Sequence, residues 1–172
     1  MGITLTTNNK SLTESYDRRL SAAKRVIYMS IGLGSTQVPV PPKSLSKIYW
    51  SVAVPKMLYG MEVIPINDHC MERLENGHRQ NAKLIQGLPS NTHTPAPLAT
   101  VGWVSVQGYV ALMTIMFIVR TMCLPDTSLF RKIMTLRVQM ILNNQICENE
   151  SVMGPVKSAL CYARKYGLGN IF

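Results

Sequence analysis

The sequence predicts an all-α fold, a bundle of six or seven helices with at most a short strand remnant at the N-terminus. Along most of the chain the apolar residues recur at steps of three and four, which is the spacing of one helix face. Gly and Pro residues separate these periodic stretches, as they do where helices end. Only residues 3–6, in which Ile3 and Leu5 alternate with threonines, have the two-residue period of a strand. A lone strand is not stable, so we expect helices to form the core.

Length and composition fit a folded protein with a basic surface. The chain has 172 residues, enough for one domain or two small lobes that share a core. Hydrophobic residues make up 47% of it and charged residues 16%, which excludes a disordered composition. The 18 basic and 9 acidic residues give a net charge of +9, which favours a polyanionic partner such as nucleic acid or an acidic surface. The charge also fits a basic protein that has no such partner.

We expect an intracellular protein, in the nucleus or the cytoplasm. The four cysteines form no C-x-x-C pair and no close framework, which is typical of reduced thiols. The first residues lack the apolar core of a signal peptide. The longest apolar run, residues 104–119, contains Gln107, is closed by Arg120 and is shorter than the ~20 residues that a membrane span needs. We therefore predict a buried core helix there, and no transmembrane helix.

The first predicted helix begins at Ser11 and Glu14, which are spaced as a capping box, and it ends at two glycines. Its apolar face consists of Leu12, Tyr16, Leu20, Ala23, Ile27 and Ile31. The opposite face carries Arg18, Ser21 and Arg25, with Arg19 and Lys24 beside them. These cations are either a solvated face, in which Glu14 pairs with Arg18, or a stripe that contacts phosphates. Residues 1–60 hold eight basic and two acidic residues, which adds weight to the second interpretation.

A second helix, residues 44–59, is predicted to be the element on which the others pack. It follows a stiff, proline-rich connector. One of its sides carries Leu45, Ile48, Tyr49, Val52 and Tyr59, and the other carries Trp50, Val54, Met57, Leu58 and Met61. A helix that is apolar on both sides belongs between neighbours, so we expect other helices to cover both. Pro55 removes one backbone donor and should kink the axis at Val54, and Gly60 should end the helix.

Five further helices are predicted. The first of them is capped by Asn67 or Asp68 and ends at Gly87. Its apolar side consists of Met71, Leu74, His78, Ala82 and Ile85, and its charged side of Glu72, Glu75, Arg79 and Lys83, with Glu75 and Arg79 as an i,i+4 pair. Residues 95–100 and 106–124 follow. The next helix, capped by Asp126 or Thr127, spaces Leu129, Ile133, Leu136 and Met140 along one face, and the last starts at Gly154-Pro155 and buries Val156, Ala159, Leu160 and Ala163.

Several short motifs resemble the segment that follows the catalytic palm in reverse transcriptases of LINE-type (non-LTR) retrotransposons. Residues 54–62, VPKMLYGME, resemble that family's V-x-P-x-x-L-Y-G-x-E segment. The family's order of L-E-x-x-x-R, G-L-P, T-P and L-G-W is matched by Leu74, Glu75, Arg79, Gly87-Leu88-Pro89, Thr94-Pro95 and Gly102-Trp103, with Val101 in place of the last motif's leucine. Gly2-Ile3 resembles the end of a Y-L-G-I motif that closes the palm. The match spans residues 2–103, and beyond residue 104 only the helix pattern is informative.

The resemblance implies a thumb-like helical bundle in residues 1–89 and a post-thumb helical region, packed on it, in residues 90–172. In the family the thumb grips a template–primer duplex of RNA or DNA through its backbone, so that partner and the missing palm and fingers are the expected partners. The expected contacts are Arg18, Arg19, Lys24, Arg25, Lys43 and Lys47, whose charges would bind phosphates without reading sequence. A start at Met1, inside the family's pattern, suggests a truncated or domesticated copy.

No catalytic, metal or cofactor site is predicted. Polymerases hold two metal ions with paired aspartates, whereas Asp17, Asp68 and Asp126 lie far apart, two of them as expected caps and Asp17 as a first-turn charge. The cysteines and histidines lack the close pairs of a zinc site, and His78 is expected to be a satisfied core residue. The aromatic residues Trp50, Trp103, Tyr49 and Tyr59 could stack on bases, but their apolar surroundings favour a place in the core.

Two other functions remain open from the sequence alone. The chain could be a helical module that binds a protein partner and no nucleic acid. Residues 104–119 could instead lie on a membrane surface. We expect a protein that is not an enzyme in any of these cases, because the palm aspartates are absent.

Overall fold

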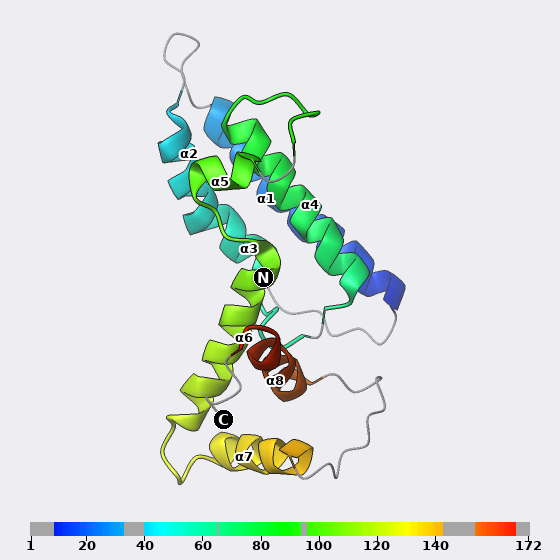
Figure 1. Cartoon of the computed structure of the whole chain (residues 1–172), viewed down its shortest axis with the longest axis vertical. Helices are drawn as coiled ribbons and strands as arrows, with labels where there is room; N and C mark the ends of the chain where they lie inside the picture. The colour runs from blue at the N-terminus through cyan, green and yellow to red at the C-terminus, as the bar shows by residue number, and fades with distance from the viewer. Residues whose placement is uncertain (1–8, 33–39, 65, 94–95, 143–153, 168–172) are drawn as a thin grey trace. The chain divides into compact units, whose positions relative to one another are not determined.

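The computed structural model describes residues 9–32, 40–64, 66–93, 96–142 and 154–167. In these ranges every regular element is helical (Figure 1), which confirms the all-α prediction of six or seven helices, since three of the elements, α2, η1 and α3, follow one another directly as one helix. The expected strand remnant at residues 3–6 lies outside the described residues. The elements are α1 (Asn9–Gly32), α2 (Pro42–Ile48), the π-helical turn η1 (Tyr49–Ala53), α3 (Val54–Leu58), α4 (Asp68–Ile85), α5 (Ala96–Val101), α6 (Val106–Met122), α7 (Leu129–Leu142) and α8 (Pro155–Lys165).

The contacts divide the chain into two units. The first comprises Met1–Tyr59 and Ile66–Gln107, and the second comprises Gly60–Pro65 and Gly108–Phe172. The sequence placed its boundary after residue 89, whereas in the structure α5 and the first two residues of α6 belong to the first unit. All six of the predicted phosphate-binding residues lie in the first unit.

Helix α1 has the predicted division into an apolar and a basic face. Tyr16, Ala23 and Ile27 are buried, and Arg18 and Arg25 are exposed. Ile31, which was also expected on the apolar face, is exposed near the end of the helix. The helix begins at Asn9, ahead of the predicted capping box, a difference of the size by which helix ends commonly vary. The expectation that Asp17 is a first-turn charge was wrong. Asp17 lies in the third turn. Its Oδ1 forms an ion pair with Arg73 Nη2 of α4 at 2.7 Å.

The predicted central helix is a single rod made of α2, η1 and α3, and it contains a turn that the sequence analysis did not predict. Pro55 has no N–H to donate, and its ring would crowd the carbonyl four residues earlier. The chain accommodates it with the π-helical turn η1, in which the Val54 N–H bonds the Tyr49 carbonyl five residues back. The rod ends at Gly60, as predicted, with φ at +77°.

The rod buries one side only, so the expectation that neighbours would cover both sides was wrong. Its buried stripe consists of Leu45, Tyr49, Ala53, Val54, Met57 and Leu58. Val52 and Tyr59, expected on a covered face, are exposed to solvent. The extra residue in η1 causes this, because it turns the second half of the rod back so that Met57 stays in line with Leu45 and Tyr49. The rod packs along α1 and, through α2, against α4.

Helix α4 has the predicted apolar side and the predicted ends. Met71, Leu74, His78, Ala82 and Ile85 are all buried. The Asn67 side chain caps the helix by accepting a hydrogen bond from the Cys70 N–H at 3.1 Å. At the other end Gly87, with φ at +64°, lets the Leu88 N–H reach the Lys83 carbonyl at 2.9 Å, which is a Schellman motif. Gly77 brings α4 close to α1, because a Cβ at that position would overlap Leu20 Cδ1.

The second unit has a small core that α6, α7 and α8 share. Ile115 and Ile118 of α6, Met134 of α7, and Val156 and Ala159 of α8 form it. Helix α8 begins at Gly154-Pro155 and buries Val156, Ala159 and Ala163, as predicted, whereas Leu160 is only half-buried. Helix α6 buries one side, on which Val110 and Ile118 are almost inaccessible, whereas Leu112 and Met116 are exposed, so the prediction of a buried core helix holds for one side only. None of the helices described is both long enough and apolar enough to cross a bilayer.

Helix α7 presents to solvent the face that the sequence analysis expected to pack. It begins one residue after Ser128, whose carbonyl accepts the Lys132 N–H, and not at Asp126 or Thr127. The side chains at the predicted spacing are exposed, namely Leu129, Ile133, Leu136 and Met140, and Phe130 is exposed beside them. Met134, Val138 and Ile141 pack on the core instead. Both sets have helical spacing, so periodicity alone could not decide between them.

Candidate nucleic-acid interface

Four of the six predicted phosphate-binding side chains are open to solvent. Arg18 and Arg25 lie on the outer face of α1, and Lys43 and Lys47 lie on α2. Arg18 and Arg25 are seven residues apart, which places them about 10 Å apart along the helix axis at ~1.5 Å per residue. Among the described residues none of the four takes part in an ion pair. These four cations are therefore free to contact an anion.

The other two predicted residues are half-buried and bind groups within the protein. Arg19 Nη1 donates to the Tyr59 carbonyl at 2.6 Å, where the rod ends and leaves that carbonyl without a helical partner. Lys24 Nζ donates to Gln80 Oε1 of α4 at 3.1 Å. Arg19 therefore ties α1 to the rod, and Lys24 lies at the junction of α1 with α4, away from the Arg18–Arg25 stripe.

Lys24 forms part of a cleft between α1 and α4 that the sequence analysis did not predict. The cleft has a volume of about 470 Å³. It is lined by Lys24, Tyr28, Asn76, Arg79, Gln80, Asn81, Lys83, Leu84, Leu88 and Ser90. Three of these are cations and none is an acid, so the cleft has a positive lining.

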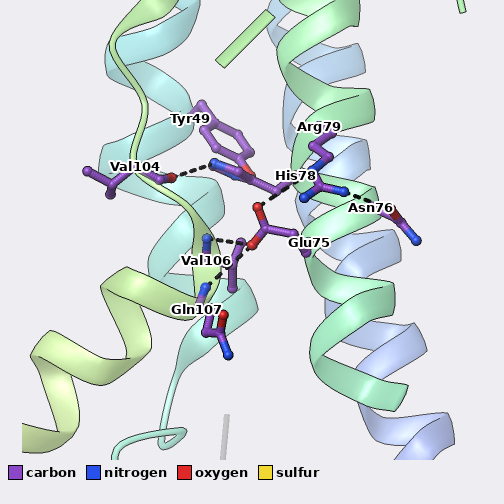
Figure 2. Close-up of polar contacts among 8 residues, drawn as sticks. All are labelled: Tyr49, Glu75, Asn76, His78, Arg79, Val104, Val106 and Gln107. Carbon is purple, nitrogen blue, oxygen red and sulfur yellow. Dashed lines mark hydrogen bonds and ion pairs between the residues drawn. The ribbon is translucent and has the colours of Figure 1, made fainter. Parts of the chain in front are cut away.

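The charges of the cleft are only partly neutralised. Arg79 Nε lies 3.7 Å from Glu75 Oε1, the predicted i,i+4 pair, and Arg79 Nη1 also donates to Asn76 Oδ1 at 3.5 Å (Figure 2). Lys83 Nζ donates to the Ser90 carbonyl at 2.7 Å, and Lys24 bonds the neutral Gln80 amide. In the described part of the chain the two lysines thus have neutral partners only, and each ammonium retains further donors.

A buried polar cluster lies beneath the charged surface of α4 (Figure 2). His78 Nε2 is 3.1 Å from the Val104 carbonyl, and His78 Nδ1 is 2.7 Å from the Tyr49 hydroxyl. A carbonyl only accepts, so Nε2 carries the proton and Nδ1 accepts from Tyr49. Burial lowers the pKa of His78 to about 4, with the Val104 carbonyl opposing this shift. His78 is thus neutral and fully bonded, which confirms the expectation of a satisfied core histidine.

Tyr49 is fully buried, and burial raises its pKa well above the ordinary value of 10.0. The Asn81 side chain opposes that shift, although its amide nitrogen makes no hydrogen bond of ordinary geometry with any described residue. The Tyr49 ring stacks on Trp103 with centroids 4.3 Å apart, and Trp103 Nε1 donates to Ser46 Oγ at 2.7 Å. Tyr49 and Trp103 are core residues, as predicted, and cannot reach a base.

Tyr59, which was also expected in the core, is 55% exposed, and Tyr28 is 59% exposed at the mouth of the cleft. Trp50 is half-buried against Tyr49 and Trp103, with which it makes edge-to-face contacts. Tyr28 is the aromatic residue that could meet a ligand in the cleft. The sequence analysis did not single out Tyr28, although it follows Ser21 by seven residues and Arg25 by three and so lies on the polar face of α1.

Glu75 has a structural role that its predicted place on the charged side of α4 did not suggest. It is 9% exposed, and its Oε2 accepts from the Val106 N–H at 2.8 Å and from the Gln107 N–H at 3.4 Å (Figure 2). These are the first two residues of α6, so a carboxylate of α4 caps the positive end of another helix. Oε1 of Glu75 makes no hydrogen bond with a described residue and faces Arg79.

The described residues offer no group of three His, Cys, Asp or Glu side chains that could hold a metal ion. Comparison of the chain with protein families, with curated proteins and with solved structures finds no match.

Proposed function

We propose that the first unit binds nucleic acid through the phosphate backbone. The observation that carries the proposal is the outer face of α1, where Arg18 and Arg25 are exposed and form no ion pair with a described residue. Arg25 Nε donates only a long hydrogen bond, 3.5 Å, to the Ser21 carbonyl of its own helix. The nearby acid Asp17 is already paired with Arg73, so it does not neutralise them. Because the two arginines lie ~10 Å apart along the helix axis, they can contact two different phosphates of one backbone.

The short motifs of residues 2–103 extend the proposal. They resemble the thumb of a LINE-type reverse transcriptase, so the chain is proposed to be a non-catalytic fragment of that kind, and its ligand a template–primer duplex. The palm and fingers of such an enzyme would be its natural partners. The function requires a place where nucleic acid is accessible, the nucleus or the cytoplasm. Lys43 and Lys47 on α2 add two exposed cations to the proposed interface.

The proposal is tested by salt-dependent binding of an RNA–DNA duplex to the whole chain, measured by fluorescence anisotropy. Changing Arg18→Ala and Arg25→Ala together removes two phosphate contacts. We expect affinity to fall by about tenfold or more, and the slope of log K against log salt to decrease by about 0.9 per lost contact.

A matched double variant, Arg164→Ala with Lys165→Ala, removes two exposed cations from α8 in the second unit. It changes the net charge equally and should leave the affinity close to that of the unchanged chain. Equal losses in the two variants would mean that only net charge matters, and no loss in the α1 variant would remove the α1 interface.

A second candidate function, a helical module for a protein partner, is favoured by one observation. Helix α7 exposes a row of apolar side chains, Leu129, Phe130, Ile133, Leu136 and Met140. Solvent-exposed apolar rows of this kind mark interaction surfaces. Changing Leu129→Ser and Leu136→Ser would weaken such an association and leave duplex binding unchanged, whereas the α1 variant would have the opposite effect. The two functions are thereby separated by paired variants in different units.

A further inference from the structure

The cleft between α1 and α4 has the size and the lining of a small-ligand site. Its volume of about 470 Å³ falls within the range of about 300–1,000 Å³ that small-molecule sites occupy. A single phosphate would fill only part of that volume. The cleft therefore has room for a larger group that carries the phosphate.

The polar part of the lining suits an anion with hydrogen-bonding groups next to it. Lys24 and Lys83 reach the cleft from opposite helices, and in the described residues neither pairs with an acid. The side-chain amides of Asn76, Gln80 and Asn81 line the same space. An amide offers both donors and acceptors, which is what the edge of a nucleobase requires.

The apolar part of the lining suits a flat ring. Tyr28 lies at the mouth of the cleft with more than half of its surface exposed, and Leu84 and Leu88 of the α4 end form a half-buried apolar wall. Base–aromatic stacking is tolerant of base identity, because every base has a π-face. The apolar wall and the cations thus lie on the same cleft, as they must for one ligand with a ring and a phosphate.

We propose that this cleft binds one unpaired nucleotide, with its phosphate at Lys24 and Lys83 and its base against Tyr28. The proposal deepens the proposed function, because it adds a single-strand subsite to a surface that grips the backbone. It rests on that function only for the source of the nucleotide, which is either a strand held by the first unit or a free nucleotide.

The test compares three probes on the whole chain: a blunt duplex, the same duplex with a single-stranded extension, and adenosine monophosphate. Tyr28→Leu should lower the affinity for the extended duplex by on the order of tenfold and leave the blunt duplex unchanged. Tyr59→Leu is the matched control, because Tyr59 is an equally exposed tyrosine of the first unit that lies outside the cleft. Lys24→Gln with Lys83→Gln should reduce the salt slope for a single-stranded oligonucleotide by about 0.7 in total, because both lysines contact the same phosphate.

The free nucleotide separates failure of this proposal from failure of the proposed function. Adenosine monophosphate should shift the amide NMR signals of Tyr28, Lys83 and Ser90 in the unchanged chain and not in Tyr28→Leu. Binding of the single-stranded extension or of adenosine monophosphate that depends on Tyr28 supports a nucleotide site in the cleft, even if the blunt duplex does not bind. The ligand of the two that binds more tightly identifies the source of the nucleotide. The proposal is overturned if Tyr28→Leu and Tyr59→Leu behave alike with every probe, or if inorganic phosphate alone gives the full shifts. Duplex binding through α1 would stand in both of those cases.

Discussion

The Tyr49 hydroxyl donates a hydrogen bond to His78 Nδ1 over 2.7 Å, and this bond joins the π-helical turn of the rod to the middle of α4. Both side chains are almost fully buried. A buried acceptor that loses its donor is left unsatisfied, so the free energy of its desolvation is no longer offset by a hydrogen bond. The bond is therefore a sensitive point for the stability of the first unit.

Tyr49→Phe should destabilise the chain by about 1–3 kcal/mol, because it keeps the ring on Trp103 but leaves His78 Nδ1 without its donor. The free energy of unfolding from urea titration measures this. Tyr59→Phe removes a hydroxyl from an exposed tyrosine and should have almost no effect. Equal effects of the two changes would show that the buried hydrogen bond contributes nothing.

Stability should fall as the pH is lowered from about 6.5 to about 4. The unfolded chain takes up a proton on His78 near pH 6.5, whereas burial holds the pKa in the folded chain at about 4. In this window the unfolded state binds more protons, so the contribution of neutral His78 is complete above pH 6.5 and is lost on acidification, by up to about 3 kcal/mol.

The measurement is the free energy of unfolding across this pH range, for the unchanged chain and for His78→Gln. The variant should lose most of the difference between pH 7 and pH 4. His69 and His93 are exposed, so His69→Gln with His93→Gln should keep the full dependence. A dependence that survives in His78→Gln would assign it to other groups.

Glu75→Ala should destabilise the chain by about 1–3 kcal/mol, because the first N–H groups of α6 lose a buried charged acceptor. Glu75→Gln retains an acceptor oxygen and should cost less. Glu72→Ala, an exposed acid one turn earlier on α4, is the matched control and should be close to neutral. Thermal unfolding that ranks Glu72→Ala with Glu75→Ala would contradict the capping role.

Gly77→Ala should change the free energy of unfolding more favourably in a chain that also carries Leu20→Ala than in the otherwise unchanged chain. We expect the two effects to differ by at least about 1 kcal/mol. Alanine is the better helix residue by about 1 kcal/mol, but its Cβ would overlap Leu20 Cδ1 across the contact of α1 with α4. A double-mutant cycle measured by denaturant unfolding gives the coupling. Additive effects of the two changes would mean that the Leu20 side chain adopts another rotamer at no cost in stability.

The sequence was informative where one face of a helix is clearly apolar and where a glycine must adopt a positive φ. The buried residues of α4 and the ends at Gly60 and Gly87 follow from these two rules. It was uninformative for α7, since Ile133 and Met134 both belong to rows with helical spacing and only the packing partners decide which row is buried. The π-helical turn also escaped prediction, because a proline in a helix can be absorbed in more than one way.

The candidate sites were predictable to different degrees. The exposed arginines of α1 follow from the pattern of one helix. The cleft does not, because Lys24 and Lys83 are far apart in the chain and meet only when α1 packs on α4. Glu75 was placed on the charged side for the same reason: nothing in its own helix shows that the start of α6 lies against it.

The π-helical turn makes the rod equivalent to an α-helix with one residue too many. Taking out Ser51, whose side chain faces solvent, together with Pro55→Ala would let the remaining residues wind as an ordinary α-helix while Leu45 and Met57 keep their alignment. The Pro55 change is needed because in an α-helix the proline ring would crowd the carbonyl four residues earlier. Taking out a residue on either side of the turn would rotate one half of the buried row away from α1. Tolerance of a shortened chain is therefore confined to one place in the rod, and relatives of this protein that differ in length here should differ at that place.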